Sequence, residues 1–181
     1  MNLPNKLTML RVFMVPIFIV ALMGDFFEEP MNRYIAVVIF ILASLTDALD
    51  GYIARSQNLV TNFGKFMDPV ADKLLVSAAL ICMVQMHDLS AWVVILIISR
   101  EFIVTAFRLV ASLDNLVIAA SNTAKFKTIF QMIMVICVLL GFQNTWYLLL
   151  CDIMIWLSVI FTVVSAAEYI MKNKSIFKDS M

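Results

Sequence analysis

The apolar residues of this chain are gathered into long runs, and short polar segments separate each run from the next. Six runs cover roughly the following residues: 12–24, 33–55, 68–87, 90–112, 124–142 and 146–171. An α-helix needs about 20 apolar residues to cross a hydrocarbon core of about 30 Å, and most of the runs approach that length. Lipid offers no hydrogen-bond partner to the backbone, so each run must be helical. The pattern predicts an all-α, polytopic membrane protein with six transmembrane helices.

The first run is shorter than the others and contains Pro16. Residues 2–11 precede it with alternating polar and apolar side chains, NLPNKLTMLR. Such a mixture is typical of a short amphipathic helix that lies in the membrane interface. No polar connection is long enough to fold separately, so residues 1–181 are predicted to form a single membrane domain.

The composition supports a membrane protein and argues against a nucleic-acid-binding protein. Hydrophobic residues make up 63% of the chain and charged residues 14%, whereas soluble domains have about 45–50% apolar and about 25% charged residues. Lys and Arg together number 13, as do Asp and Glu, so the net charge is zero. A nucleic-acid-binding protein would show a basic surface, and no nucleic-acid partner is therefore expected.

The basic residues fall mainly on one side of the predicted membrane. That side carries Lys6, Arg11, Arg55, Lys65, Lys73, Arg108, Lys125, Lys127, Lys172, Lys174 and Lys178. The opposite side carries only Arg33, near Asp25, Glu28 and Glu29. The excess of Lys and Arg in cytoplasmic segments of membrane proteins then places both termini in the cytoplasm.

Four aspartates stand at the cytoplasmic ends of the second and third runs. Asp47 and Asp50 are three residues apart and Asp68 and Asp72 four apart, so each pair shares one face of its helix. The connection between the two helices is short, which lets the pairs converge. Carboxylates at this density repel one another unless cations lie between them. Hard oxygen ligands suit Mg²⁺, Mn²⁺ or Ca²⁺, and paired ions of this kind are common in phosphoryl chemistry.

The residues around the aspartates suit a phosphate ester. Gly51 directly follows Asp50, and Gly64 precedes Asp68 by four residues. Glycine lets a ligand or a facing helix approach the backbone closely. Arg55 can present its guanidinium fork to a phosphate.

The whole segment reads D-x2-D-G-x2-A-R-x8-G-x3-D-x3-D and resembles the signature of the CDP-alcohol phosphotransferase family. All eight fixed positions match: Asp47, Asp50, Gly51, Ala54, Arg55, Gly64, Asp68 and Asp72. The six-span topology of that family agrees with the prediction above. The resemblance implies an enzyme that transfers a phosphatidyl-type group from a CDP-linked donor to an alcohol and releases CMP. It further implies a homodimer in the bacterial cytoplasmic membrane, with a cytoplasmic active site.

The same resemblance implies roles for single residues. Asp47, Asp50 and Asp68 hold two ions of Mg²⁺ or Mn²⁺, and Asp72 both contributes to one ion and serves as the general base. The CDP moiety is contacted by Gly51, Arg55 and Thr61. Asn5, Thr8 and Arg11 resemble family positions near the nucleotide and head group, so that Thr8 is expected to bind CDP-diacylglycerol; interfacial anchoring is the alternative for these three.

The N-terminal stretch NLPNKLTMLRVFMVPIF and the segment SREFIVTAFRL resemble bacterial family members that use sn-glycerol 3-phosphate as the acceptor. An acceptor with a dianionic phosphate requires basic residues, and four are available: Arg100, Arg108, Lys125 and Lys127. Arg100 and Arg108 are eight residues apart and lie on similar faces of one helix. Each of the four also has a plainer interpretation, as a topological charge or a snorkelling side chain.

Two neighbours of these bases affect the prediction. Glu101 is expected to pair with Arg100 or another base, which is a structural role. Ala124 stands where related enzymes often have glycine, a difference expected to reshape the acceptor pocket slightly.

Two alternatives stay open at this stage. The same chemistry with serine, inositol phosphate or phosphatidylglycerol as the acceptor would leave the four aspartates with the same roles. A transporter or a structural protein that binds divalent cations would instead show pseudo-repeats or broken mid-membrane helices.

Overall fold

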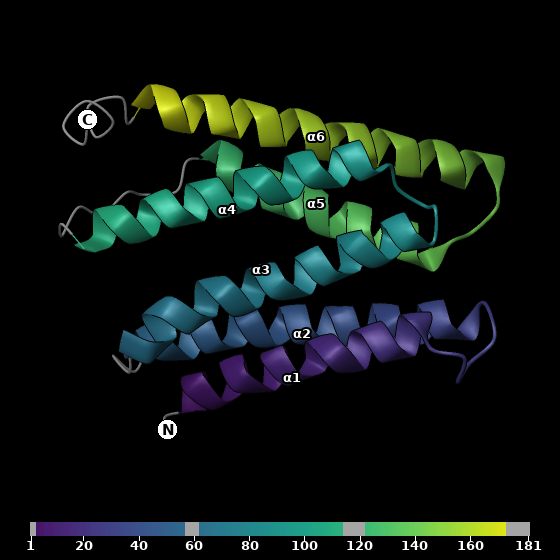
Figure 1. Cartoon of the computed structure of the whole chain (residues 1–181), viewed down its shortest axis with the longest axis horizontal. Helices are drawn as coiled ribbons and strands as arrows, with labels where there is room; N and C mark the ends of the chain where they lie inside the picture. Colours follow the sequence, from purple (N-terminus) through teal and green to yellow (C-terminus); the bar gives the residue numbers. More distant parts are fainter. Residues whose placement is uncertain (1–2, 57–61, 114–121, 173–181) are drawn as a thin grey trace. The chain divides into compact units, whose positions relative to one another are not determined.

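The computed structural model describes residues 3–56, 62–113 and 122–172. Its α-helices follow one another along the chain (Figure 1): α1 Leu3–Met23, α2 Met31–Ser56, α3 Asn62–Gln85, α4 Ala91–Leu113, α5 Asn122–Leu140 and α6 Thr145–Lys172. The described residues contain no strand. The prediction of an all-α protein is therefore confirmed.

The chain divides into two compact units. The first comprises Met1–Leu89 and Val138–Gly141, and the second Ser90–Cys137 and Phe142–Met181. In the first unit, α1 and α3 run in one direction and α2 in the other, as Figure 1 shows. In the second unit, α4 packs against α6. The single domain expected over residues 1–181 stays a prediction.

The N-terminal segment forms one helix rather than two. α1 continues without a break from Leu3 to Met23, through Pro16. The separate interfacial helix expected over residues 2–11 is therefore not confirmed, because its residues share a helix with those of the first span. α3 also begins earlier than expected, at Asn62 instead of residue 68. In both places the helix begins among polar residues, ahead of its apolar run. A hydropathy pattern marks only the apolar part of a helix, so it does not show where such a helix begins.

One stripe of α1 faces the interior of the first unit. Its buried residues are Thr8, Arg11, Val15, Phe18 and Leu22, which recur at alternating intervals of three and four. This is the spacing of one helix face. The stripe is polar at the start of α1 and apolar at its end. The polar part therefore faces the interior where the neighbouring helices carry their aspartates.

The apolar part of this interior is closely packed. Phe18 of α1 and Phe40 of α2 lie with ring centroids 6.2 Å apart and ring planes inclined at 53°. Ala36 and Ala43 of α2 are fully buried, and such small residues let helix backbones approach each other.

The inward faces of α2 and α3 also turn from apolar to acidic. On α2, buried Phe40 and Ala43 lead at helical spacing to Asp47. On α3, Asp68 stands two turns before buried Leu75. The cores of these helices therefore end in carboxylates at the end where α1 is polar.

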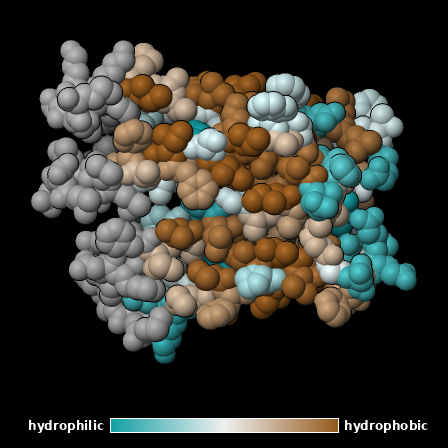
Figure 2. Space-filling view, in the orientation of Figure 1, coloured by the Kyte–Doolittle hydropathy of each residue, from teal (hydrophilic) through white to brown (hydrophobic). Residues whose placement is uncertain are grey.

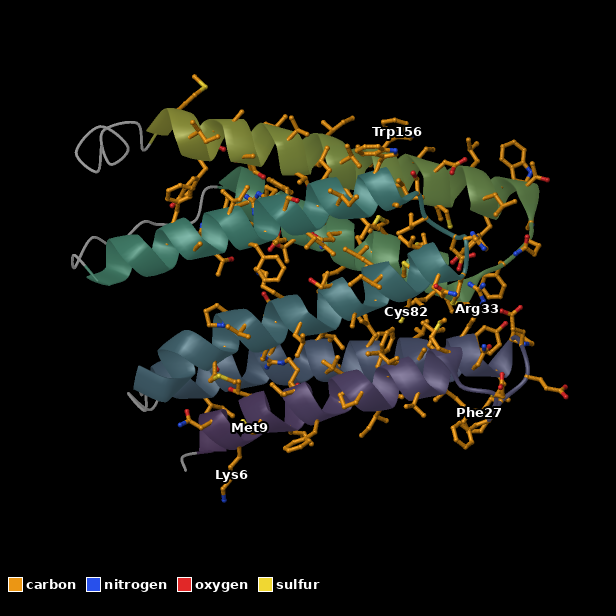
Figure 3. All side chains as sticks on the ribbon, viewed as in Figure 1. Lys6, Met9, Phe27, Arg33, Cys82 and Trp156 are labelled. Carbon is orange, nitrogen blue, oxygen red and sulfur yellow. The ribbon has the colours of Figure 1, made fainter. Side chains whose placement is uncertain are left out.

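Among the residues that the structure describes, three helical segments are long and apolar enough to cross a membrane by length and composition: Asn5–Met23, Thr123–Leu140 and Thr145–Met171. α2, α3 and α4 have 26, 24 and 23 residues but carry more charged side chains. Apolar side chains cover the length of the helices, and hydrophilic ones gather at the end that holds the α1–α2 connection (Figure 2). Trp156, for example, projects outward from α6 and is exposed (Figure 3). The helices thus present an apolar exterior suited to lipid.

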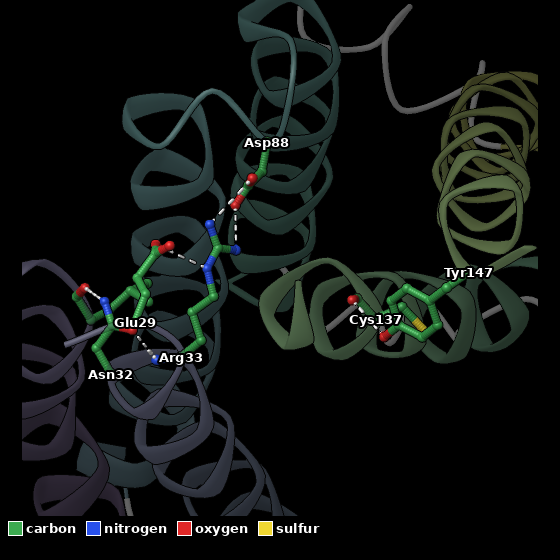
Figure 4. A network of polar contacts seen from close by, with 7 residues as sticks. Glu29, Asn32, Arg33, Asp88, Cys137 and Tyr147 are labelled. Atoms are coloured by element: carbon green, nitrogen blue, oxygen red, sulfur yellow. Dashed lines mark hydrogen bonds and ion pairs between the residues drawn. The ribbon is translucent and has the colours of Figure 1, made fainter. Parts of the chain in front are cut away.

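A polar cluster ties α2 to the segment after α3, at the end of α2 far from Asp47 (Figure 4). Nη1 and Nη2 of Arg33 lie 2.7 Å and 3.4 Å from the carboxylate oxygens of Asp88. Nε of Arg33 donates to Glu29 at 3.3 Å. Beside it, Nδ2 of Asn32 donates to the carbonyl oxygen of Leu22 at 3.2 Å, which ties α2 to the end of α1.

Gly141 packs directly against this cluster. Its φ is +63°, and a Cβ atom there would lie 3.0 Å from both Cδ and Nη1 of Arg33. Only glycine adopts this backbone conformation routinely. The close approach of Arg33 therefore depends on the missing side chain.

Candidate active site

Asp47 is held by a buried arginine. Nη1 of Arg11 lies 2.7 Å from Oδ1 of Asp47, with the arginine side chain 1% exposed and the aspartate 42% exposed. Nε of the same guanidinium donates to the carbonyl oxygen of Ala43, one turn earlier on α2, at 3.3 Å. The cation is therefore inside the helix cluster, while the carboxylate keeps an accessible surface.

Asp68 is held from the same face of α1. The hydroxyl of Thr8 donates to Oδ1 of Asp68 at 2.6 Å. Thr8 is fully buried and stands three residues before Arg11. Side chains at that spacing are neighbours on a helix surface. One face of α1 thus contacts a signature carboxylate of α2 and a signature carboxylate of α3.

Asp72 lies one turn after Asp68 on α3. Nζ of Lys73 is 2.7 Å from its Oδ2, and the two side chains are 23% and 39% exposed. An ion pair with this much exposure contributes little to stability, at most about 1 kcal/mol. The carboxylate is accessible to a ligand, as an acid–base group must be.

The remaining signature residues are described less fully. Asp50, Gly51 and Arg55 lie in helix α2, and their side chains are outside the described set. Thr61 lies outside the described residues altogether. Within the described part of the chain, no group of three His, Cys, Asp or Glu side chains is placed to hold a metal ion. The structure thus brings Asp47 and Asp68 to one face of α1 and leaves the four-aspartate cluster a prediction.

The donors that are described fit a divalent cation. Carboxylate oxygens are the ligands that Mg²⁺ and Mn²⁺ prefer. Asp47 and Asp68 are each contacted from α1 through Oδ1. A carboxylate that is held through one oxygen can bind a cation through its other oxygen, because each oxygen offers lone pairs.

Two of the four predicted acceptor bases share a carboxylate in the second unit. The ammonium of Lys127 on α5 pairs with Oε1 of Glu101 on α4, and Lys127 is 3% exposed. Nη1 of Arg100 lies 3.3 Å from the same oxygen. The expectation that Glu101 pairs with a base is confirmed, and both Arg100 and Lys127 are partners of its carboxylate.

The other two bases are arranged differently. Lys125 is exposed, whereas Arg108 is half-buried. Nε of Arg108 is buried, and among the described residues no hydrogen-bond partner is found for it. Nearby in sequence, the hydroxyl of Thr123 donates to Glu168, which joins the start of α5 to the end of α6.

Sequence reasoning missed the role of Arg11 as the partner of Asp47. It placed Arg11 and Thr8 near the nucleotide or in the membrane interface. The signal was present in the spacing of Thr8, Arg11, Val15 and Phe18, which assigns the two polar residues to the buried face of α1. It was hidden by the assumption that residues 2–11 form a separate surface helix.

Comparison with known proteins agrees with the signature. The family model for CDP-alcohol phosphatidyltransferase matches residues 1–164. A Bacillus subtilis (strain 168) protein named CDP-diacylglycerol–glycerol-3-phosphate 3-phosphatidyltransferase is 46% identical over 192 residues, which cover 99% of this chain and 98% of that protein. Proteins of the same name from Rickettsia bellii (strain RML369-C) and Haemophilus influenzae are 37% and 36% identical over 179 and 185 residues. The two alignments cover 97% and 99% of this chain, respectively, and 97% of the length of each relative.

The matched residues include the aspartate signature, the face of α1 that contacts it and the basic residues of α4 and α5. On these grounds the chain belongs to the CDP-alcohol phosphatidyltransferase family.

Proposed function

We propose that this chain transfers a phosphatidyl group from CDP-diacylglycerol to sn-glycerol 3-phosphate. The products are phosphatidylglycerophosphate and CMP, and the reaction serves the biosynthesis of phosphatidylglycerol. Relatives that carry the name of this reaction align with nearly the whole chain. The observation that carries the proposal is the contact of one α1 face with both Asp47 and Asp68.

The metal site is assigned to Asp47, Asp50 and Asp68, with a contribution from Asp72. These residues would hold two ions of Mg²⁺ or Mn²⁺, and the ions would neutralise the pyrophosphate of the donor and stabilise the leaving CMP. The described carboxylates supply the required donor chemistry, and their contacts with α1 fix one oxygen of each.

Asp72 is the general base. Its carboxylate accepts the proton of the acceptor hydroxyl, whose oxygen forms a bond to the β-phosphorus of the donor. The bond from that phosphorus to the bridging oxygen breaks, and CMP leaves with the bonding electron pair. Two features support this assignment: the carboxylate of Asp72 is 39% exposed, and its Oδ2 lies 2.7 Å from Nζ of Lys73, which holds the carboxylate in place.

The phosphate of the acceptor is assigned to the basic residues of the second unit, Arg100, Arg108, Lys125 and Lys127. Glu101 offsets one of their positive charges, since it pairs with both Arg100 and Lys127. The net charge of this group is positive, because one glutamate accompanies three bases: Arg100, Arg108 and Lys127. Lys125 adds a further positive charge. This excess suits an acceptor that carries a phosphate better than a neutral one such as serine.

We propose that all six helices span the bacterial cytoplasmic membrane, with both termini and the active site cytoplasmic, and that the enzyme is a homodimer. Helices of 26, 24 and 23 residues reach about 35–39 Å, which exceeds a hydrocarbon core of about 30 Å. α2, α3 and α4 each present large exposed apolar side chains, among them Leu45, Ile81 and Phe102. Lipid or a second copy of the chain covers such surfaces.

The acceptor assignment is tested by CMP release from CDP-diacylglycerol with purified protein in detergent and Mg²⁺. Glycerol 3-phosphate, serine, inositol phosphate and phosphatidylglycerol are supplied one at a time. We expect CMP release to depend on glycerol 3-phosphate and to stop when the metal is chelated. Turnover with another acceptor only would contradict the proposed substrate and leave the transfer chemistry intact.

A further inference from the structure

We propose that Thr8 and Arg11 are positioning residues that hold the carboxylates of Asp68 and Asp47 in the orientation required for binding the metal ions. This inference rests on the proposed metal site. It adds that a third helix, which carries none of the signature aspartates, determines how two of them are presented.

The guanidinium of Arg11 is held in one place by α2. It contacts two groups one turn apart on that helix: the carbonyl oxygen of Ala43 through Nε at 3.3 Å, and Asp47 through Nη1 at 2.7 Å. Ala43 is itself fully buried and has only a methyl side chain, which leaves room for the arginine. A buried charge without partners is strongly destabilising, so the arginine is confined to positions in which it keeps these contacts.

The carbonyl oxygen of Ala43 has a second side-chain donor. The hydroxyl of Thr46 donates to it at 2.6 Å. The carbonyl oxygen of Ala43 therefore accepts hydrogen bonds from Arg11 of α1 and from Thr46 of α2. Thr46 directly precedes Asp47, the residue that pairs with Arg11. Arg11 is accordingly attached to the backbone of α2 as well as to the side chain of Asp47, and the carboxylate is aligned against a fixed group.

Thr8 acts on α3 in a corresponding way. It is fully buried, and its hydroxyl lies 2.6 Å from Oδ1 of Asp68, which is a short hydrogen bond. Threonine has few χ1 rotamers, so a buried threonine directs its hydroxyl well. The hydrogen bond therefore restricts the rotation of the Asp68 carboxylate.

The two contacts start from neighbouring positions on α1. Residues three apart on a helix have Cβ atoms about 5–6 Å from each other. Among the described residues, α1 contacts both α2 and α3 more extensively than α2 and α3 contact each other. The relative placement of Asp47 and Asp68 is thus determined largely through α1. Residues that hydrogen-bond metal ligands in this way typically change metal affinity or activity by about 10–100-fold when they are replaced.

Charge-preserving variants separate orientation from simple electrostatics. Thr8→Val keeps the shape of the side chain and removes the donor. Arg11→Lys keeps the positive charge, but a single ammonium cannot reproduce the fork that spans Ala43 and Asp47. Neither substitution changes the net charge near the aspartates, so an altered cation affinity reports the orientation of the carboxylates.

The chain offers a matched control for each variant. Arg33→Lys alters another arginine that lies 2.7 Å from an aspartate in the same unit, at the far end of α2. Thr162→Val alters another fully buried threonine, on α6. Thr8→Ser restores a hydroxyl at position 8. Melting of each full-length variant in detergent establishes that it is folded.

The measurement is the Kd for Mn²⁺, obtained by titrating the purified proteins and following the electron paramagnetic resonance signal of free Mn²⁺. We expect Thr8→Val and Arg11→Lys to raise this Kd by about 10–100-fold. Thr8→Ser and both control variants should keep the wild-type Kd, even where their melting temperatures fall.

Unchanged Mn²⁺ affinity in folded Thr8→Val and Arg11→Lys would overturn the positioning role while leaving the proposed function standing. If one variant fails to fold, the other decides. Wild-type protein that binds no Mn²⁺ would instead overturn the metal site, and the inference with it.

Discussion

The ammonium of Lys127 on α5 is buried against the carboxylate of Glu101 on α4, and the guanidinium of Arg100 contacts the same carboxylate. Glu101 therefore joins two of the bases that the sequence suggested for one ligand. A pair so completely removed from solvent is sensitive to the loss of either partner, because the remaining charge is left uncompensated. Arg100 and Lys127 thus have a structural partner in addition to the acceptor phosphate that we propose for them.

Glu101→Leu is expected to lower the free energy of unfolding by about 3–5 kcal/mol, since it leaves the ammonium of Lys127 buried without its partner. The double variant Glu101→Leu with Lys127→Met should be more stable than Glu101→Leu alone, because no unpaired ammonium remains. Melting temperatures in detergent measure both. A double variant that is no more stable than Glu101→Leu alone would show that the pair is not coupled in this way.

Lys125 provides the contrasting case, because its side chain is exposed. We expect Lys125→Met to raise the KM for glycerol 3-phosphate and to leave the melting temperature unchanged. Loss of one charged contact to a phosphate corresponds to about 1.5–3 kcal/mol, or roughly a 10- to 150-fold change in KM. Steady-state kinetics with varied acceptor concentration test this, and an unaltered KM would remove Lys125 from the acceptor site.

Arg33 should affect stability without affecting chemistry. It lies 14 residues before Asp47 on α2, a separation of about 21 Å along the helix. Arg33→Met removes the contacts with Asp88 and Glu29 and is expected to cost about 1–3 kcal/mol of stability. Turnover per folded molecule, measured by CMP release well below the melting temperature, should match the wild type. A large loss of turnover in folded protein would show that this cluster is coupled to the active site.

Much of the fold could be predicted from the sequence because lipid imposes helices on long apolar runs. The predicted run 90–112 corresponds to Ala91–Leu113, and the run 146–171 to Thr145–Lys172. The errors are at polar helix ends. The hydropathy pattern does not show that α1 begins at Leu3 or that α3 begins at Asn62, because both helices begin among polar residues.

The candidate site was predictable to a different extent. The spacing of Asp47, Asp68 and Asp72 identified the acidic side chains, because a signature records residue types at fixed intervals. It did not identify Arg11 and Thr8 as their partners, because those contacts depend on the angle at which α1 packs on the other helices. The pairing of Lys127 with Glu101 was likewise foreseen only as one of several options, since any nearby base satisfies a lone glutamate.

The central claim is tested most directly at Asp72. CMP release from CDP-diacylglycerol is measured with glycerol 3-phosphate and Mg²⁺, for the wild type and for Asp72→Asn at equal amounts of folded protein. Loss of a general base lowers a reaction rate by about 10²–10⁴-fold. We therefore expect the rate of CMP release that depends on glycerol 3-phosphate to be lower in Asp72→Asn than in the wild type by a factor in that range. An Asp72→Asn protein that releases CMP at the wild-type rate would contradict the account.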